Sequence, residues 1–191
     1  MDNALCEAYD IRFEGLSILE CGAHREGHET EMFRLSNDCY YIEPILAELD
    51  ILRQQNTIKR ENTFNYALTK YDGETSFTVS SWPGNSSVQH SEEHLQELAS
   101  RRAVLTKITV PCITYKTFIQ SIIKKPIDIL VLDIEGGEVD VLESMKELNV
   151  EELPKIFAIE AGYDWEKRKI LLKELGYKID FYFDNNVVLS H

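Results

Sequence analysis

At residues 127–138 the sequence reads IDILVLDIEGGE. The apolar run 127–132 is typical of a strand that is covered on both faces. It ends in three carboxylates and two glycines, and in open α/β sheets ligands bind at the edge where the parallel strands end. Close carboxylates repel one another unless they meet a cation, hydrogen-bond donors or water. The stretch therefore predicts a parallel sheet with a site at the carboxyl end of this strand.

On both sides of this stretch, short apolar runs alternate with amphipathic segments, the pattern of strands joined by crossover helices. Further strands are expected at 17–20, 39–42 and 156–159, and a closing antiparallel hairpin at 177–183 and 187–189. Segments 64–69, 75–79 and 107–110, with a turn at Asp72-Gly73 between the first two, indicate a third strand and an appended hairpin. Helices are expected at 28–35, from Pro44 onward, and at 114–123, 139–145 and 165–175. The fold class is α/β, a doubly wound sheet.

Composition limits both size and partners. The chain has 191 residues, 43% of them hydrophobic, which allows one domain with a sizeable core but not two. Its formal net charge of −13 repels phosphate backbones and excludes nucleic acid as a general partner. No apolar stretch approaches the roughly 18 residues of a membrane span, and no secretion signal is seen. We expect no membrane insertion, a cytoplasmic location, and four reduced cysteines that form no zinc motif. A homodimer is left open.

Two further residues indicate a nucleotide-like cofactor. Gly22 directly follows the first expected strand, where a glycine allows close approach of a ligand. Glu43 ends the second strand, 21 positions later, the separation expected of an acid that binds ribose hydroxyls. Each residue alone also fits a plainer explanation, a tight turn for Gly22 and a helix N-terminal acid for Glu43.

Taken together, these residues resemble the FkbM-type methyltransferases. The resemblance covers position 17 to the end of the chain and rests on four motifs, ECGAH at 20–24, YIEP at 41–44, NYAL at 65–68 with DGE at 72–74, and above all DIEGGE at 133–138. It implies a Rossmann-like, mostly parallel seven-strand sheet with an antiparallel C-terminal strand. It also implies S-adenosyl-L-methionine as cofactor and O-methylation of a sugar, a glycan or a similar small hydroxyl-bearing acceptor.

The resemblance also suggests roles for single residues. It places Gly22 against the methionine portion of the cofactor and Glu43 at the ribose. Glu20, Ala23 and Pro44 are further residues expected to bind the cofactor. Ala67 and Leu68 would flank the adenine, and Asp133 would lie near the reacting centre. One domain over 1–191 is expected, with 1–16 as a short extension and 80–106 as a variable excursion on the acceptor side.

The first loop departs from the family pattern D-x-G-A-N/H-x-G. Glu20 replaces the aspartate, Glu26 stands where the second glycine is expected, and Gly27 follows one position late. Either the loop is shifted without harm, or its grip on the cofactor is weakened.

For the base that accepts the acceptor's proton, Asp133 is the first candidate, followed by Glu135 and His24, because a carboxylate desolvated in a cleft has its pKa raised toward neutrality. If a divalent metal takes part, Asp133, Glu135 and Glu160 would hold it. Two rival interpretations use the same residues, a nicotinamide-dependent oxidoreductase and a cofactor-binding protein without catalysis.

Overall fold

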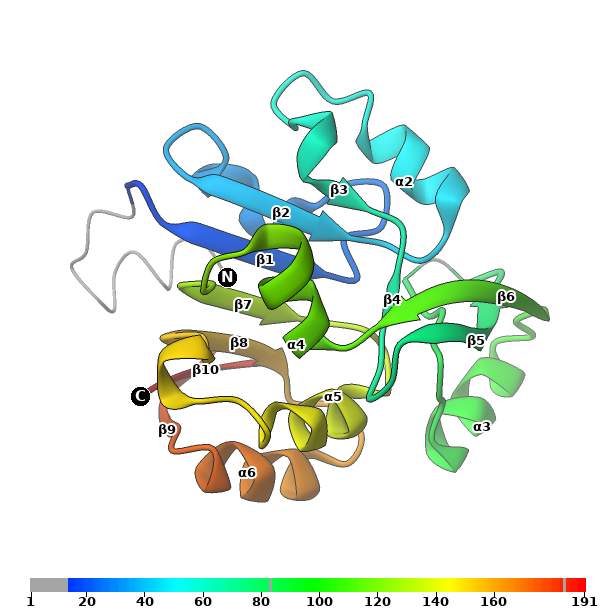
Figure 1. Cartoon of the computed structure of the whole chain (residues 1–191). Helices are drawn as coiled ribbons and strands as arrows, with labels where there is room; N and C mark the ends of the chain where they lie inside the picture. Colours follow the sequence, from blue (N-terminus) through cyan, green and yellow to red (C-terminus); the bar gives the residue numbers. More distant parts are fainter. Residues whose placement is uncertain (1–13, 83, 184) are drawn as a thin grey trace.

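A seven-stranded sheet with the order β3-β2-β1-β7-β8-β10-β9 forms the centre of the protein (Figure 1). The structure, a computed structural model, describes residues 14–82, 84–183 and 185–191, so most of the expected extension 1–16 lies outside the described residues. The strands of this sheet are β1 (Ser17–Cys21), β2 (Asp38–Ile42), β3 (Thr63–Phe64), β7 (Ile129–Leu132), β8 (Ile156–Glu160), β9 (Lys178–Phe183) and β10 (Asn186–Ser190).

The direction of the strands is the one expected. The β1 strand pairs in parallel with β2 and β7, and the β2–β3 and β7–β8 pairs are parallel as well. The β10 strand is antiparallel to both β8 and β9. The prediction of a mostly parallel seven-strand sheet with an antiparallel last strand is therefore confirmed.

Helical segments cover both faces of the sheet. They are η1 (His28–Phe33), α2 (Leu46–Leu52), η2 (Arg60–Asn62), α3 (Glu92–Ser100), α4 (Tyr115–Thr117), η3 (Phe118–Ile123), α5 (Glu138–Met145), η4 (Val150–Glu152) and α6 (Trp165–Glu174). Leu130 and Leu132 of β7 point to the face packed by α4, η3, α5 and α6, whereas Ile129 and Val131 point to the face packed by η1 and α2. This alternation explains why all four residues of β7 are apolar: each buried side chain contributes about 1.5–3 kcal/mol.

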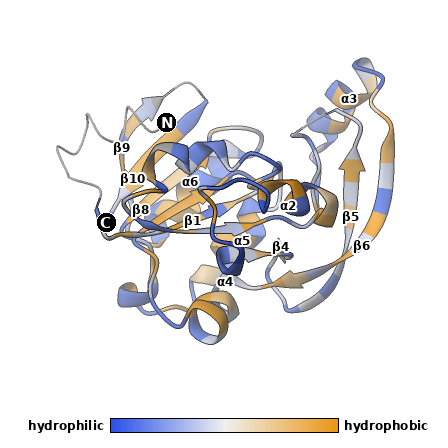
Figure 2. Ribbon diagram, turned by 90° about the horizontal axis from the view of Figure 1, so that it is seen from above, coloured by the Kyte–Doolittle hydropathy of each residue, from blue (hydrophilic) through white to orange (hydrophobic). Residues whose placement is uncertain are grey.

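A second, three-stranded sheet stands to one side of the central one (Figure 2). It has the order β4-β6-β5, with β4 at Ala67–Leu68, β5 at Gly73–Ser80 and β6 at Leu105–Ile113. The expected strand 64–69 is therefore divided between two sheets. Asn65 lies at the break, where its side-chain amide donates to the carbonyl oxygens of Glu43 and Pro44 at 2.9 and 2.8 Å. Residues 72–73 lead from β4 into β5, but β5 pairs with β6 rather than with β4.

Two helices also differ from expectation. Pro44 does not open a helix: α2 begins at Leu46 with Ile45 as its N-cap, and the Glu43 side chain accepts the Ile45 N–H just before the helix. The expected helix at 114–123 begins as α4 and continues as the wider π-helix η3. A wider turn places Ile122 and Ile123 on the same core as Phe118 and Ile119.

Within the described residues, no helix is long and apolar enough to cross a membrane.

Candidate active site

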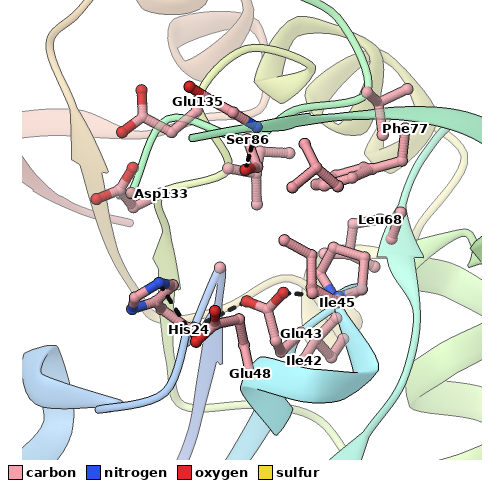
Figure 3. A pocket seen from close by; sticks show the side chains of 18 of the residues that line it. His24, Ile42, Glu43, Ile45, Glu48, Leu68, Phe77, Ser86, Asp133 and Glu135 are labelled. Atoms are coloured by element: carbon pink, nitrogen blue, oxygen red, sulfur yellow. Dashed lines mark hydrogen bonds and ion pairs between the residues drawn. The ribbon is translucent and has the colours of Figure 1, made fainter. Parts of the chain in front are cut away.

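A cavity opens where β1, β2 and β7 end, and the three-stranded sheet forms its far wall (Figure 3). The space between its walls, counted out into the open mouth, is about 910 Å³. The sequence motifs supply Gly22, His24, Glu43, Pro44, Ala67, Leu68, Asp133 and Glu135 to its lining. The cavity thus brings together residues from four separate motifs, at the edge of the sheet where ligands were expected.

One end of this cavity is apolar. Ile45, Leu68, Phe77 and Val79 line it, and Leu68 and Phe77 are buried. Figure 3 shows Phe77 and Leu68 facing Ile45 across this end, with Asp133 and His24 at the other. A flat apolar ring system fits the first end, and a polar or cationic group fits the second.

Glu43 is held rigidly between the two ends. One carboxylate oxygen accepts the His24 N–H at 2.8 Å, and the other accepts the Ile45 N–H at 2.7 Å. Burial raises the pKa of Glu43 to about 7, although both hydrogen bonds act in the opposite direction. Each oxygen keeps a second lone pair, so the group can still accept hydrogen bonds from a ligand.

The first loop contributes less than expected. Gly22 lines the cavity, but a Cβ on it would lie 1.7 Å from the Asp133 carbonyl oxygen, so the glycine also permits the loops after β1 and β7 to meet. Glu20 and Ala23 are buried and do not line the cavity. Side chains alternate along a strand, and Glu20 points to the same face as Ile18, where it accepts the Thr30 hydroxyl at 2.6 Å. Burial raises the pKa of Glu20 to about 8.

The altered residues of this loop are accommodated without entering the cavity. Glu26 is exposed. Gly27 adopts a left-handed φ of 55° and donates its N–H to the Ala23 carbonyl at 2.8 Å. The Arg34 guanidinium donates to the carbonyl oxygens of Glu26 and Gly27. The loop therefore closes one residue later than the family pattern.

The loop after β7 carries the acids of the site. Asp133 Oδ1 is buried and has no hydrogen-bond partner among the described residues. Burial, with the nearby charges of Glu160 and Glu138, raises the pKa of Asp133 to about 7. Burial and the charge of Asp133 raise the pKa of Glu135 to about 8. Arg168 is the cation that opposes these shifts.

These acids do not assemble a metal site. Burial and the charge of Glu138 raise the pKa of Glu160 as well. The charge of Glu160 in turn raises the pKa of Asp133 and Glu135. In 14–82, 84–183 and 185–191, however, no group of three or more His, Cys, Asp or Glu side chains is placed to hold a metal ion.

A second, more polar cavity of about 630 Å³ lies on the other side of Glu135. Glu135 lines both cavities, whereas Glu160, Tyr163 and His94 line only the second. The excursion that follows β5 forms part of its wall: His94 stacks on Tyr163 with ring centroids 5.1 Å apart, and the Tyr163 hydroxyl donates to Glu97 at 2.6 Å.

His24 lines the first cavity. Its φ of 51° is left-handed, and its Nε2 lies 3.5 Å from a Glu48 carboxylate oxygen, which Arg25 also contacts at 2.7 Å. The Glu48 carboxylate thus lies between the His24 ring and the Arg25 guanidinium.

Sequence reasoning missed the wall residues Phe77 and Val79, and it missed Arg168. The wall residues belong to a strand whose neighbours are distant in the chain. Arg168 stands in the charged run Lys167-Arg168-Lys169, which resembles an exposed helix face, although Arg168 is only 4% exposed.

Solved structures that resemble this chain at low identity include the following three. The crystal structure titled methyltransferase FkbM from Methylobacillus flagellatus KT has a TM-score of 0.58 and 15% identity, covering 95% of this chain and 45% of that one. A chain of the fibrillarin/Nop5p complex has a TM-score of 0.46 and 14% identity, covering 94% and 72%. Precorrin-6y C5,15-methyltransferase from Geobacter metallireducens GS-15 has a TM-score of 0.45 and 9% identity, covering 98% and 85%.

The present chain thus spans less than half the length of the M. flagellatus protein, and the likeness shows the fold alone. The search of the curated proteins gives no match. The methyltransferase FkbM domain model, however, matches residues 20–184, which contain all four motifs and both cavities. The chain belongs to the FkbM methyltransferase domain family, whose cofactor is S-adenosyl-L-methionine.

Proposed function

We propose that the chain binds S-adenosyl-L-methionine in the first cavity and transfers its methyl group to the hydroxyl oxygen of a small polar acceptor. The observation that carries the proposal is the placement of Glu43 and Asp133 in one cavity. Glu43 follows β2 and Asp133 follows β7, the two strands that flank β1. Glu43 offers two fixed oxygens to vicinal hydroxyls. Asp133 offers a buried oxygen without a partner to a positively charged group.

The rest of the cavity fits the same cofactor. Its apolar end, formed by Ile45, Leu68 and Phe77, suits an adenine ring. Ala67 and Pro44 also line the cavity, as the family resemblance suggested. The cofactor, when bound, supplies an electrophilic methyl group, and the protein contributes orientation, exclusion of water and a base.

Asp133 is the proposed base. Burial raises its pKa to about 7, and a general base is most efficient when its pKa lies near the pH at which it acts. Glu135 is the second candidate because it borders both cavities. His24 is the third, since it lines the first cavity and contacts Glu48.

The second cavity is the proposed place for the acceptor. Carboxylates of Glu135 and Glu160 accept hydrogen bonds from hydroxyl groups, and the Tyr163 ring offers a face to a sugar ring. These features support a neutral, hydroxyl-rich acceptor such as a sugar or glycan unit. The excursion 80–106 would then shape the acceptor side of the site.

Calorimetry with S-adenosyl-L-methionine and NAD tests the cofactor. We expect the wild-type protein to bind S-adenosyl-L-methionine selectively and Glu43→Ala to bind it at least about tenfold more weakly, because two charge-assisted hydrogen bonds are lost. Glu61→Ala removes an exposed carboxylate of η2 and serves as the control. Absence of binding would reject the proposal. A preference for NAD would also reject it and would favour an oxidoreductase.

The acceptor is tested by screening neutral sugars, uronic acids and sugar phosphates for a methylated product. We expect methylation of neutral sugars and loss of turnover in Asp133→Asn with the cofactor still bound. Cofactor binding without turnover on every acceptor would favour a binding protein that lacks catalysis.

A further inference from the structure

Two backbone N–H groups of the acidic loop 133–138 donate to one carboxylate oxygen of Glu138. Glu138 opens α5, and its Oε1 accepts the N–H groups of Ile134 and Gly136 at 3.3 and 3.1 Å. Glu135 lies between these two residues in a left-handed conformation with φ of 60°, which a residue with a side chain rarely adopts. The position of Glu138 Oε1 therefore fixes the backbone that carries Glu135.

Arg168 of α6 holds the other side of Glu138. Its Nη2 lies 2.9 Å from Glu138 Oε2, and its Nη1 donates to the Glu160 carbonyl at 2.8 Å. The two side chains are 4% and 1% exposed. Arg168 thereby joins α6, the end of β8 and the start of α5.

This pair is poorly suited to a purely stabilising role. Neither Glu138 Oε2 nor Arg168 Nε has a hydrogen-bond partner among the described residues, so the 2.9 Å contact is an ion pair without good hydrogen-bond geometry. Buried ion pairs of this kind are often replaceable by apolar residues without loss of stability. What apolar residues could not supply is the acceptor for the Ile134 and Gly136 N–H groups.

The pair also lies outside the proposed cofactor cavity. Glu138 and Arg168 line the second cavity but not the first. Asp133 and Glu135, the neighbours of Ile134 in the chain, line the first. Arg168 can therefore act on the cofactor cavity in two ways, through its charge, which lowers the pKa of Asp133 and Glu135, and through the shape of the loop, on which amide exchange reports.

We propose that Arg168 is a positioning residue that, through Glu138, sets the conformation of the acidic loop and thereby the affinity for S-adenosyl-L-methionine. The affinity part rests on the proposed function. The conformational part does not, because the protection of two backbone amides reports on it directly.

The experiment uses full-length Arg168→Gln, Arg168→Lys and Glu138→Asp. Calorimetry measures affinity for S-adenosyl-L-methionine, and hydrogen exchange measures protection of the Ile134 and Gly136 amides. Arg168→Gln removes the charge, Arg168→Lys retains it, and Glu138→Asp shortens the side chain so that its oxygen no longer reaches both amides. Lys169→Gln removes an exposed pair with Glu166 on the same helix and is the matched control.

We expect Arg168→Gln and Glu138→Asp to weaken affinity about tenfold, with faster exchange at both amides, while circular dichroism stays native. Arg168→Lys should recover most of the affinity, and Lys169→Gln should match the wild type. If Arg168→Gln does not fold, Glu138→Asp decides the question.

Native affinity and native protection in the folded variants would overturn the proposal, as would a loss confined to thermal stability. If the wild-type protein fails to bind S-adenosyl-L-methionine, the proposed function fails, and the exchange of the two amides still decides whether Arg168 positions the loop.

Discussion

Replacing Glu20 by glutamine tests the cost of burying a carboxyl group outside the cavity. Burial raises the pKa of Glu20 from 4.5 to about 8, so the folded protein holds this proton more tightly than the unfolded chain does. The contribution of such a group to stability is complete below pH 4.5 and is lost as the pH rises toward 8. At about 1.4 kcal/mol per pH unit, the free energy of unfolding falls by roughly 4 kcal/mol between pH 5 and pH 8 on account of Glu20.

Urea unfolding at pH 5, 6, 7 and 8 measures this contribution. We expect Glu20→Gln, which is neutral and of the same length, to gain stability relative to the wild type as the pH rises, by roughly 4 kcal/mol at pH 8. Glu26→Gln removes an exposed carboxylate from the same loop and should follow the wild type. Parallel curves for Glu20→Gln and the wild type would refute the reasoning, because they would mean that Glu20 is not desolvated.

Three further predictions concern the loops around the cavity. Gly22→Ala should lower stability by at least about 3 kcal/mol in thermal unfolding, since its Cβ would lie 1.7 Å from the Asp133 carbonyl oxygen at a φ of 84°. Gly136→Ala should make the excursion 80–106 more sensitive to proteolysis, because its Cβ would lie 2.0 Å from the Gln89 carbonyl oxygen. Gly84→Ala, whose Cβ would meet no atom within 4 Å, is the control. Binding of cationic S-adenosyl-L-methionine at pH 7 should release protons in the wild type but fewer in Asp133→Asn, because a nearby cation lowers a carboxyl pKa. Calorimetry in buffers of different ionisation enthalpy measures this release.

The sequence predicted the central sheet well because local patterns determine it. The apolar run of β7 reflects burial on both faces, and its neighbours β1 and β8 carry the same pattern. Glu43 and Asp133, which follow β2 and β7, line one cavity because parallel strands end at a common edge. For the same reason, Glu43 and Asp133 could be assigned to one site from their positions alone.

Pairing between distant strands was not predictable in this way. The β4 strand has two residues, and its partner β6 follows after the whole of β5 and α3. Nothing in residues 64–69 signals that the chain leaves one sheet for another, apart from Asn65, whose amide must find acceptors on the turn after β2. The wall of the cavity was missed for this reason.

A raised pKa does not by itself identify a functional acid in this protein. Burial raises the pKa of both Glu20 and Asp133 into or above the neutral range. Glu20 is enclosed and accepts the Thr30 hydroxyl, so its environment is complete within the fold. Asp133 borders a cavity and has an oxygen without a partner. The same desolvation thus lowers stability at both positions above neutral pH, but only at Asp133 can a bound cation compensate for it. A buried acid that a ligand can pair with is what a binding site requires, whereas Glu20 has its partner, Thr30, within the fold.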